Sequence, residues 1–358
     1  MPVRVAVNGY GTIGKRVVDA VARQSDLRLT GVADIRPNYE IRTARAKGYP
    51  IFLAGTGSAE EFRTEGIEVA GRMDDLIRAS DVVVDCTPEG VGRENAKLYR
   101  EAGVSAIFQG GEKADVAEVS FSALANFDAA RGKKQVRVVS CNTTGLSRAA
   151  AVLLPAFGVE HWEATLARRA ADPRESGKGP IDGILPSFKI PSHHGPDVRT
   201  VFPDLSIVTT AMVVSTTLMH VHANHVRLSR PPLSAREVID RFRASPRFQL
   251  FREGDRVVGT PQVLEYGRDR SPGGRPDVME NVLWEHGIHL MGKDLYFFQA
   301  IHQESIVVPE NVDAIRAMFN LADGPTSIAM TDRALGIGRS PPPVAARASA
   351  AGPPARGT

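Results

Sequence analysis

Cys141 has the sequence surroundings of a nucleophilic thiol. It follows the run Val136–Ser140, which is typical of a strand, and precedes Asn142–Thr144, residue types that commonly begin a helix. A thiol at a helix N-terminus lies at the positive end of the helix dipole, which lowers its pKa and increases the thiolate fraction. Asn142 and the backbone amides of the same turn are candidates to stabilise a developing oxyanion. The pattern therefore predicts covalent chemistry on sulfur.

Cys86, the second of the two cysteines, has different surroundings. It ends the apolar run Val82–Asp85, and we interpret it as a buried small hydrophobe, the commoner role of a lone cysteine. Two cysteines without a C-x-x-C spacing predict neither a disulfide framework nor a zinc site, and they indicate a reducing compartment.

A cysteine nucleophile needs a base, and nine histidines are available. His220 and His222 alternate along the predicted strand 216–222, so both side chains should point to the same face of a sheet. We expect one of them to contact Cys141, although a hydrogen-bonded structural histidine is the alternative for either. No third ligand stands at a recognised spacing from this pair, so we expect no zinc or iron.

Two further pairs are candidates to bind an anion. His193 and His194 follow Pro191 in a predicted loop, and Arg168 and Arg169 are adjacent near the end of a predicted strand. The alternative interpretation is a surface loop and a solvated arginine pair.

The glycine motif Gly9–Gly14, G-Y-G-T-I-G, predicts a dinucleotide site because a strand precedes it and a helix follows it. Gly9 allows the tight turn, Gly11 lets the backbone approach a pyrophosphate, and Gly14 lets the helix pack against the strand. The helix N-terminus would attract the pyrophosphate charge. The alternative is a glycine-rich turn that binds nothing.

Asp34 ends the next predicted strand, where a carboxylate would bind the ribose hydroxyls of NAD and repel the extra phosphate of NADP. Arg36, two residues further on, could instead approach that phosphate. The sequence favours NAD and leaves the use of both cofactors open.

These candidates require elements that position them. Apolar strand-like runs alternate with amphipathic stretches over the first 140 residues, which predicts βαβ units and a doubly wound parallel sheet. From about 159 to 298, longer β-branched runs broken by Pro and Gly predict an α+β part with a mixed, largely antiparallel sheet. The uncharged stretch Leu205–Val226 is interpreted as sheet rather than a membrane span, because its histidines and hydroxyls would be costly in lipid. A final helix is predicted over Glu310–Leu321.

Composition narrows the class of function. The 358 residues include 44 Lys and Arg against 41 Asp and Glu, with the charges scattered along the chain. No basic stripe for nucleic acid or a membrane surface is implied, so we expect a small-molecule partner. No secretory signal fits the start, and we expect a cytoplasmic protein. The stretch 339–358, rich in Pro, Ala and Arg, is predicted to be a disordered tail.

Eight ordered segments resemble one known family, the archaeal-type (type II) phosphorylating glyceraldehyde-3-phosphate dehydrogenases. They span about residues 2–338 and are N-G-Y-G-T-I-G-K-R-V (8–17), F-Q-G-G-E-K (108–113), R-V-V-S-C-N-T-T-G-L (137–146), A-R-R-A-A-D (167–172), K-G-P-I (178–181), P-S-H-H-G-P-D-V (191–198), T-T-L-M-H (216–220) and H-Q-E-S-I-V-V-P-E-N-V-D-A-I-R-A (302–317).

The resemblance implies the oxidation of glyceraldehyde 3-phosphate with inorganic phosphate to 1,3-bisphosphoglycerate, with Cys141 as the nucleophile and His220 as the base. It places Thr12, Ile13, Gly111, Arg169 and Gln303 against the cofactor, and Ser140, Asn142, His193 and His194 against the substrate. It also implies a homotetramer. The final helix would pack on the cofactor domain, which gives a Rossmann domain of residues 1–140 with 303–338 and a catalytic domain of 141–302.

Two departures from the family pattern are relevant. Many relatives have a lysine that suits NADP where this chain has Asp34, and the tail after Gly338 has no counterpart. Two rival functions remain open: another cysteine-dependent Rossmann semialdehyde dehydrogenase, and a dinucleotide-binding regulator without catalysis.

Overall fold

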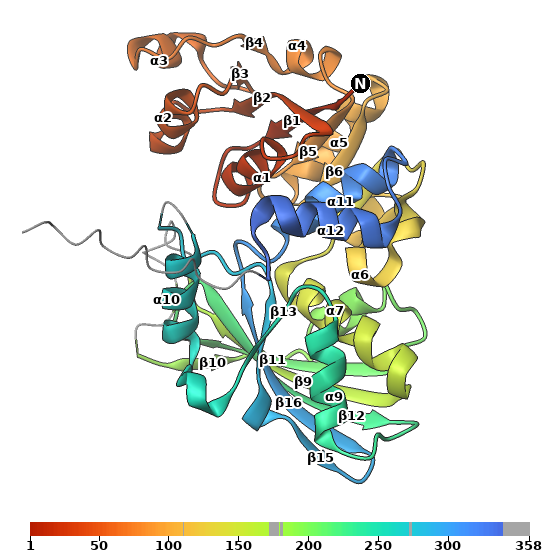
Figure 1. Ribbon diagram of the computed structural model, residues 1–358. Coiled ribbons are helices and arrows are strands. Elements are labelled where there is room, and N and C mark those ends of the chain that lie inside the picture. The colour runs from red at the N-terminus through yellow and green to blue at the C-terminus, as the bar shows by residue number, and fades with distance from the viewer. Residues whose placement is uncertain (110, 172–178, 180–181, 272–273, 339–358) are drawn as a thin grey trace, which may run out of the picture.

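The computed structural model describes residues 1–109, 111–171, 179, 182–271 and 274–338 of the chain. Two sheets lie one above the other in Figure 1, and helices pack on their faces. Residues 3–138 supply the strands of the upper sheet, and residues 159–302 supply those of the lower sheet. The predicted tail, 339–358, lies outside the described residues.

All eight strands of the upper sheet run parallel. In order across the sheet they are β4 (Gly71–Arg72), β3 (Ile51–Leu53), β2 (Leu27–Asp34), β1 (Val3–Asn8), β5 (Val82–Asp85), β6 (Ser105–Phe108), β8 (Gln135–Val138) and β7 (Val119–Phe121). β5, β6 and β8 are buried along their whole length, as in sheets that helices cover on both faces. The strand order reverses at β1, and ligands bind at the carboxyl ends of the strands beside such a reversal.

Helices cover the upper sheet, and two of them come from the far end of the chain. The helices within the first 130 residues are α1 (Gly14–Val21), α2 (Tyr39–Ala46), α3 (Ala59–Thr64), α4 (Met73–Arg78), α5 (Val91–Glu101) and α6 (Ala123–Asn126). α11 (Val308–Met318) and α12 (Gly324–Leu335) return to the same part of the molecule (Figure 1). Val312 and Ile315 of α11 share a buried cluster with Val5 of β1 and Val17 of α1, so the C-terminal helices complete this core.

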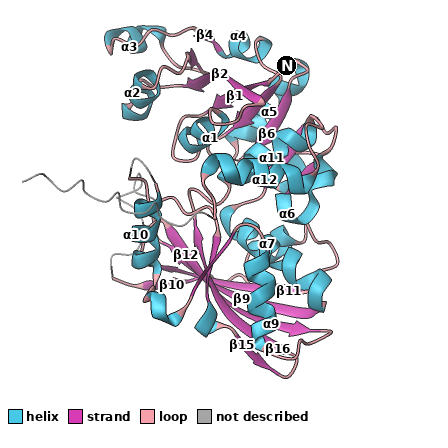
Figure 2. Cartoon of the chain, in the orientation of Figure 1, coloured by secondary structure: helices cyan, strands magenta, loops and turns pink. Residues whose placement is uncertain are grey.

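The lower sheet, whose strands are magenta in Figure 2, is mixed. In order its strands are β10 (Ile184–Pro186), β11 (Ile207–Val214), β9 (Val159–Arg169), β12 (Met219–Leu228), β16 (Asp294–His302), β14 (Asn281–Trp284) and β13 (Phe248–Phe251), with β15 (His289–Met291) beside β16. β9 runs parallel to β11, and β13 to β14, whereas the other neighbours are antiparallel. The remaining helices are α7 (Cys141–Phe157), α8 (His194–Val198), α9 (Ala235–Ala244) and α10 (Thr260–Arg270).

α7 and α9 cover one face of the lower sheet, and α10 covers part of the other, where its Val263 packs in a buried cluster with Val282 of β14 and Ala300 of β16. Leu153 of α7 and Phe242 of α9 pack in a buried cluster with Trp162 of β9. Tyr296 and Phe298 of β16 point away from this cluster and are 37% and 49% exposed. Because strand residues alternate between faces, this exposed aromatic surface belongs to the side of the sheet opposite α7 and α9.

The predicted fold class, a Rossmann doubly wound sheet with an α+β part, is confirmed. Leu205–Val226 forms β11 and part of β12, as predicted. The final predicted helix begins two residues earlier and ends three residues earlier than expected, and α12 was not predicted at all. The described chain contains no helix whose length and apolar character would suit a membrane crossing.

Candidate active site

Cys141 is the first residue of α7, directly after β8 reaches the carboxyl edge of the upper sheet. Ser140 is the N-cap residue, and its hydroxyl accepts the backbone N–H of Thr143 at 3.5 Å. The first N–H groups of a helix have no acceptor within the helix, and this end of α7 lies beside the half-buried thiol. The predicted helix start at Cys141 is therefore confirmed.

His220 lies next to Cys141, with its Nε2 atom 3.6 Å from Sγ. Its Nδ1 atom accepts the backbone N–H of Arg169 at 3.0 Å, which places the proton of a neutral ring on Nε2, toward the sulfur. Burial, followed by the nearby His222, Arg168 and Arg169, lowers the pKa of His220 well below its ordinary value. The structure therefore favours a neutral imidazole that donates to Cys141.

His222 does not reach the thiol, although it shares the face of β12 that carries His220. Its Nε2 atom lies 2.8 Å from Oδ1 of Asn142, and its Nδ1 atom lies 3.1 Å from Nε2 of Gln299. Complete burial lowers its pKa to about 3. Since the amide of Gln299 donates to Nδ1, His222 is neutral and donates from Nε2 to Asn142.

Asn142 connects His222 to His194. Its Nδ2 atom is 3.3 Å from Nε2 of His194, whose Nδ1 atom is 3.0 Å from the hydroxyl of Ser192. Burial lowers the pKa of His194 to about 2. We call the group formed by His222, Asn142, His194, Ser192 and Gln299 the imidazole network. The side chain of Asn142 therefore points toward His194 and His222. The backbone amides at the start of α7 are then better candidates than Asn142 to stabilise an oxyanion at Cys141.

The predicted loop is confirmed for His193, which lies in a turn, and is wrong for His194. His193 is the N-cap residue of the short helix α8, which His194 begins, and the two rings stack with centroids 3.8 Å apart. Asp197 of α8 accepts a 2.7 Å bond from Arg137 of β8 and a 2.6 Å bond from the hydroxyl of Thr143. A five-residue helix held by such distant partners has no periodic sequence signal.

Arg168 faces the same site from β9. Trp162, Ala164 and Leu166 are buried on one face of that strand, and strand alternation places Arg168 on the same face, beneath α7. Burial lowers its pKa while the nearby Cys141 raises it, and its Nε atom is buried without a hydrogen-bond partner in the described chain. An unpaired guanidinium beside a nucleophile is suited to an anion.

The glycine turn has the backbone that a pyrophosphate requires. Gly9 has φ +92°, and a Cβ there would lie 3.0 Å from backbone atoms of Cys86. A Cβ on Gly14 would lie 1.8 Å from the carbonyl oxygen of Gly9, so no other residue fits. The turn leads into α1, whose N-terminus has no side-chain cap. These features fit a nicotinamide dinucleotide at the predicted positions Gly9, Gly11 and Gly14.

Asp34 ends β2 beside this turn, as predicted. Its Oδ2 atom accepts the backbone N–H of Tyr10 at 3.1 Å, and its Oδ1 atom accepts those of Ile35 and Arg36 at 2.8 and 3.3 Å. The three amides fix the carboxylate at the edge of the turn. An oxygen that accepts one amide retains a second lone pair for a hydroxyl.

Further predicted cofactor residues meet near His220. Arg169 donates from Nε to the side-chain oxygen of Gln303, and the backbone N–H of Gln303 bonds to Leu218 at 2.8 Å. Gly111, with φ +86°, lies beyond β6 at the carboxyl edge of the upper sheet. The structure thus brings Arg169 and Gln303 together beside the Cys141–His220 pair.

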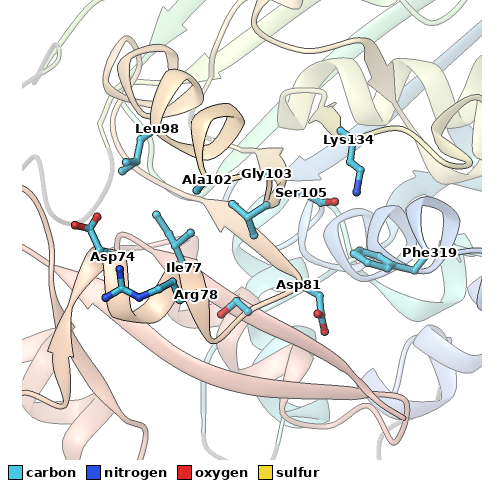
Figure 3. Close-up of a pocket in the computed structure, with 12 residues that line it drawn as sticks. Asp74, Ile77, Arg78, Asp81, Leu98, Ala102, Gly103, Ser105, Lys134 and Phe319 are labelled. Atoms are coloured by element: carbon cyan, nitrogen blue, oxygen red, sulfur yellow. The ribbon is translucent and has the colours of Figure 1, made fainter.

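The pocket in Figure 3 lies at the opposite edge of the upper sheet. Ile77, Leu98 and Phe319 line it, together with Asp81 and Ser105 at the amino ends of β5 and β6. None of its lining residues is a predicted site residue. Among the described residues, no three His, Cys, Asp or Glu side chains cluster as metal ligands.

Sequence reasoning missed Gln299 and Ser192 in the site, as well as Arg16, which lies under the glycine turn. Arg16 follows Gly14 by two residues and is 6% exposed. A buried polar residue inside a helix or strand has no local pattern of its own, because its partners are distant in the sequence. The motif F-Q-G-G-E-K does not contain any of these three residues. It indicated only that the loop at Gly111 approaches the cofactor site.

A parallel sheet with a glycine turn at its carboxyl edge, beside a cysteine paired with a histidine, defines a dinucleotide-dependent oxidoreductase that uses a thiol. Residues 140–271 match the family model of the glyceraldehyde 3-phosphate dehydrogenase C-terminal domain, and residues 3–141 match that of the dihydrodipicolinate reductase N-terminus.

Curated relatives cover almost the whole chain. A glyceraldehyde-3-phosphate dehydrogenase of Archaeoglobus fulgidus is 51% identical over 95% of this chain and 99% of its own length. Those of Halobacterium salinarum and Thermococcus kodakarensis are 52% and 49% identical over 94% of this chain, and over 100% and 99% of their own lengths. The chain belongs to the glyceraldehyde-3-phosphate dehydrogenase family, in its archaeal type.

Proposed function

We propose that this protein oxidises D-glyceraldehyde 3-phosphate to 1,3-bisphosphoglycerate, with inorganic phosphate and a nicotinamide dinucleotide. The observation that carries the proposal is the Cys141–His220 pair, with Sγ and Nε2 3.6 Å apart at the start of α7. The names of the archaeal relatives supply the substrate.

The thiolate of Cys141 attacks the aldehyde carbon, which forms a C–S bond and an alkoxide. The backbone amides at the start of α7 and the Nε2–H of His220 stabilise this oxygen. The dinucleotide supplies the hydride acceptor. The resulting thioester on Cys141 is attacked by inorganic phosphate, which releases the acyl phosphate and restores the thiolate. Attack by a thiolate gives an alkoxide, which has no hydroxyl proton for a base to remove. His220 therefore needs only to donate a hydrogen bond in this step.

The base role predicted for His220 carries a structural condition. A base at Nε2 needs an unprotonated nitrogen there, and a neutral ring then carries its proton on Nδ1. The backbone N–H of Arg169 donates to Nδ1 at 3.0 Å, so this contact must break first. The base role therefore stays a prediction.

NAD is the preferred cofactor in this proposal. The carboxylate of Asp34 is held in place by three backbone amides, where it can accept a ribose hydroxyl and repel a 2′-phosphate. Thr12 and Ile13 belong to the turn that holds the pyrophosphate, and Gly111, Arg169 and Gln303 contact the cofactor from the catalytic side. NADP use through Arg36 is the alternative outcome.

Phosphate groups bind at Arg168 and His193 in this proposal. Within the described part of the chain, Arg168 has a buried Nε atom without a hydrogen-bond partner, and the exposed His193 is close enough for Arg168 to lower its pKa, after burial. Ser140, Asn142 and His194 are assigned to the substrate site as predicted, with His194 and Asn142 acting from within the imidazole network.

We also infer the assembly and the division into domains. The exposed Tyr296 and Phe298 on the lower sheet, and Ile184, Leu185 and Phe188 near β10, support a homotetramer that covers them. Strand membership and the return of α11 and α12 support a cofactor domain of 1–140 with 303–338 and a catalytic domain of 141–302. A cytoplasmic location follows from the proposed metabolic role.

Steady-state kinetics with glyceraldehyde 3-phosphate, phosphate and each cofactor test the proposal. Turnover should be higher with NAD than with NADP. An unphosphorylated semialdehyde should react about 100-fold less efficiently, because it leaves the half-buried Arg168 guanidinium without an anion. Faster oxidation of a carboxylated semialdehyde would replace the proposed substrate with that of the rival dehydrogenase.

Thiol labelling separates the enzyme from a catalytically inactive regulator. Iodoacetamide at neutral pH should modify Cys141 within minutes and Cys86 far more slowly, since burial and the neighbouring Asp85 raise the pKa of Cys86. Equal, slow modification of both thiols would favour the regulator.

A further inference from the structure

Arg16 on α1 is a buried arginine with three partners in three different segments. Its Nη1 atom donates to the carbonyl oxygen of Thr12 at 2.7 Å, within the glycine turn. Its Nε atom donates to Asp277 at 2.8 Å, and its Nη2 atom lies 2.6 Å from Oε2 of Glu304. The side chains of Arg16 and Glu304 are each 6% exposed. One guanidinium thus connects the turn to the catalytic part of the molecule.

Glu304 stands next to Gln303 in the segment between β16 and α11. The side chain of Gln303 accepts a hydrogen bond from Arg169, and the backbone N–H of Arg169 donates to His220. His220 in turn contacts Cys141. A continuous series of contacts therefore runs from the glycine turn through Arg16, Glu304, Gln303 and Arg169 to the catalytic pair. Its links are hydrogen bonds, the Arg16–Glu304 ion pair and the chain bond between Gln303 and Glu304.

The geometry of this junction requires an arginine. A planar guanidinium presents donors along three directions, whereas a lysine ammonium is a single point at the end of a flexible stem. A second contact joins the same helix to the same neighbouring segment, since Arg275 donates to Asp19 at 3.1 Å. That contact touches neither Thr12 nor Glu304, and it supplies an internal control.

We propose that Arg16 is a positioning residue that couples occupation of the glycine turn to the reactivity of Cys141. The inference rests on the proposed function, in which the turn holds a dinucleotide and Cys141 is the reacting thiol. A pyrophosphate on the turn amides fixes the Thr12 carbonyl, and Arg16 transmits that position to Glu304, Gln303 and the Arg169 amide that orients His220. Where the coupling acts on an equilibrium of the thiol, such as its ionisation, it is reciprocal, so the ionisation state of the thiol also affects affinity at the turn.

ADP-ribose tests the coupling because it carries the pyrophosphate and the adenosine but has no nicotinamide to approach the thiol. The rate of Cys141 modification by iodoacetamide is measured by mass spectrometry, with and without ADP-ribose at a concentration that saturates each variant. We expect ADP-ribose to change the wild-type rate about fivefold or more, which is within the range usual for allosteric coupling. In Arg16→Gln and Arg16→Lys the change should fall below about 1.5-fold, a near loss of the coupling free energy.

Two further variants keep the test decisive. Glu304→Gln breaks the same junction from the other side and should lose the effect, even where Arg16→Gln folds poorly. Arg275→Gln should keep the wild-type response. The proposal is overturned by an unchanged response in Arg16→Gln, by rescue in Arg16→Lys, by equal loss in Arg275→Gln, or by no response in the wild type. The readout needs no turnover, so a failure to oxidise glyceraldehyde 3-phosphate would reject the proposed function separately.

Discussion

Two buried polar clusters lie along α7, and they handle charge in opposite ways. The imidazole network lies beneath the helix N-terminus and holds neutral side chains. The second, which we call the ionic cluster, consists of Arg148, Arg247, Glu310, Asp313 and Asp332. Arg148 follows Cys141 by seven residues, so the clusters are about two helical turns apart.

In the ionic cluster every charge has an opposite partner. Arg148 and Arg247 both contact Oε1 of Glu310, at 2.6 and 3.0 Å, and Arg247 also contacts Asp313 and Asp332. Burial opposes ionisation of Glu310, but the two arginines outweigh it, and the pKa of Glu310 lies below its ordinary value. Paired charges hold α7 and α11 together, because removal of one partner leaves another charge buried alone.

The imidazole network has no opposite charges, and burial therefore keeps His222 and His194 neutral. Hydrogen bonds fix the orientation of each ring without adding charge near Cys141. The comparison shows that ion pairs anchor the middle of α7. At its reactive end the imidazole network is neutral, so the helix dipole and Arg168 are the groups that stabilise the thiolate charge.

The largest expected effect is a loss of activity at the reactive end of α7, without a loss of stability from the ionic cluster. Cys141→Ala should lower kcat/KM by about 10⁴-fold or more, equivalent to roughly 5.5 kcal/mol of transition-state stabilisation, because nucleophile and histidine act as a unit. Steady-state kinetics with glyceraldehyde 3-phosphate measures it. Cofactor affinity and the thermal midpoint should stay near wild type, since no ion pair is lost. Appreciable activity in Cys141→Ala would reject the nucleophile.

The next effect falls on stability. Glu310→Gln should lower the free energy of unfolding by about 3–5 kcal/mol, because Arg148 and Arg247 lose the carboxylate they share. Urea unfolding measures the change. The matched control is Glu101→Gln on α5, whose side chain is 64% exposed in its pair with Lys97 and should change stability by less than about 0.5 kcal/mol. Equal effects of the two substitutions would contradict the assigned role of the cluster.

Acid should lower the free energy of unfolding through the histidines of the imidazole network. The pKa of His222 is about 3 in the folded protein and about 6.5 when unfolded, so the unfolded state binds more protons between these values. Stability should therefore be complete above about pH 6.5 and fall as pH decreases toward 3, by at most about 1.4 kcal/mol per pH unit for this group. Urea unfolding at several pH values gives the slope.

His222→Gln should reduce that slope, because glutamine replaces the hydrogen bonds without taking up a proton. His289→Gln is the control, since His289 is exposed on β15 and contacts water in both states. A slope that His222→Gln leaves unchanged would mean that His222 is not the group that protonates on acid unfolding.

The smallest effect concerns the cap of α7. Ser140→Ala should cost about 1 kcal/mol of stability, because the N–H of Thr143 loses its side-chain acceptor. Ser140→Thr keeps the hydroxyl and should recover most of this loss in thermal unfolding. Because the same cap defines the helix end at Cys141, the alkylation rate of Cys141 should fall slightly in Ser140→Ala and not in Ser140→Thr.

Local patterns predicted much of the fold and part of the candidate site. The alternation of strands and amphipathic stretches predicted the upper sheet. The glycine spacing predicted the turn whose Gly9 has a positive φ, and Asp34 was correctly placed at the end of β2. α12 was missed because its apolar residues are few, and its position depends on packing against α11.

The sequence by itself determined the chemistry that each end of an element offers: a thiol at a helix start, two imidazoles on one strand face and glycines in a turn. These signals are local, since they depend on residues within one or two turns or on strict alternation. The local pattern left both imidazoles open and the family resemblance implied His220, but the tertiary structure is what brings His220 to the sulfur. The pairing of β12 with β9 and the packing of α7 place His220 against Cys141 and His222 against Asn142, because sheet register and helix position are set by contacts between residues distant in the chain.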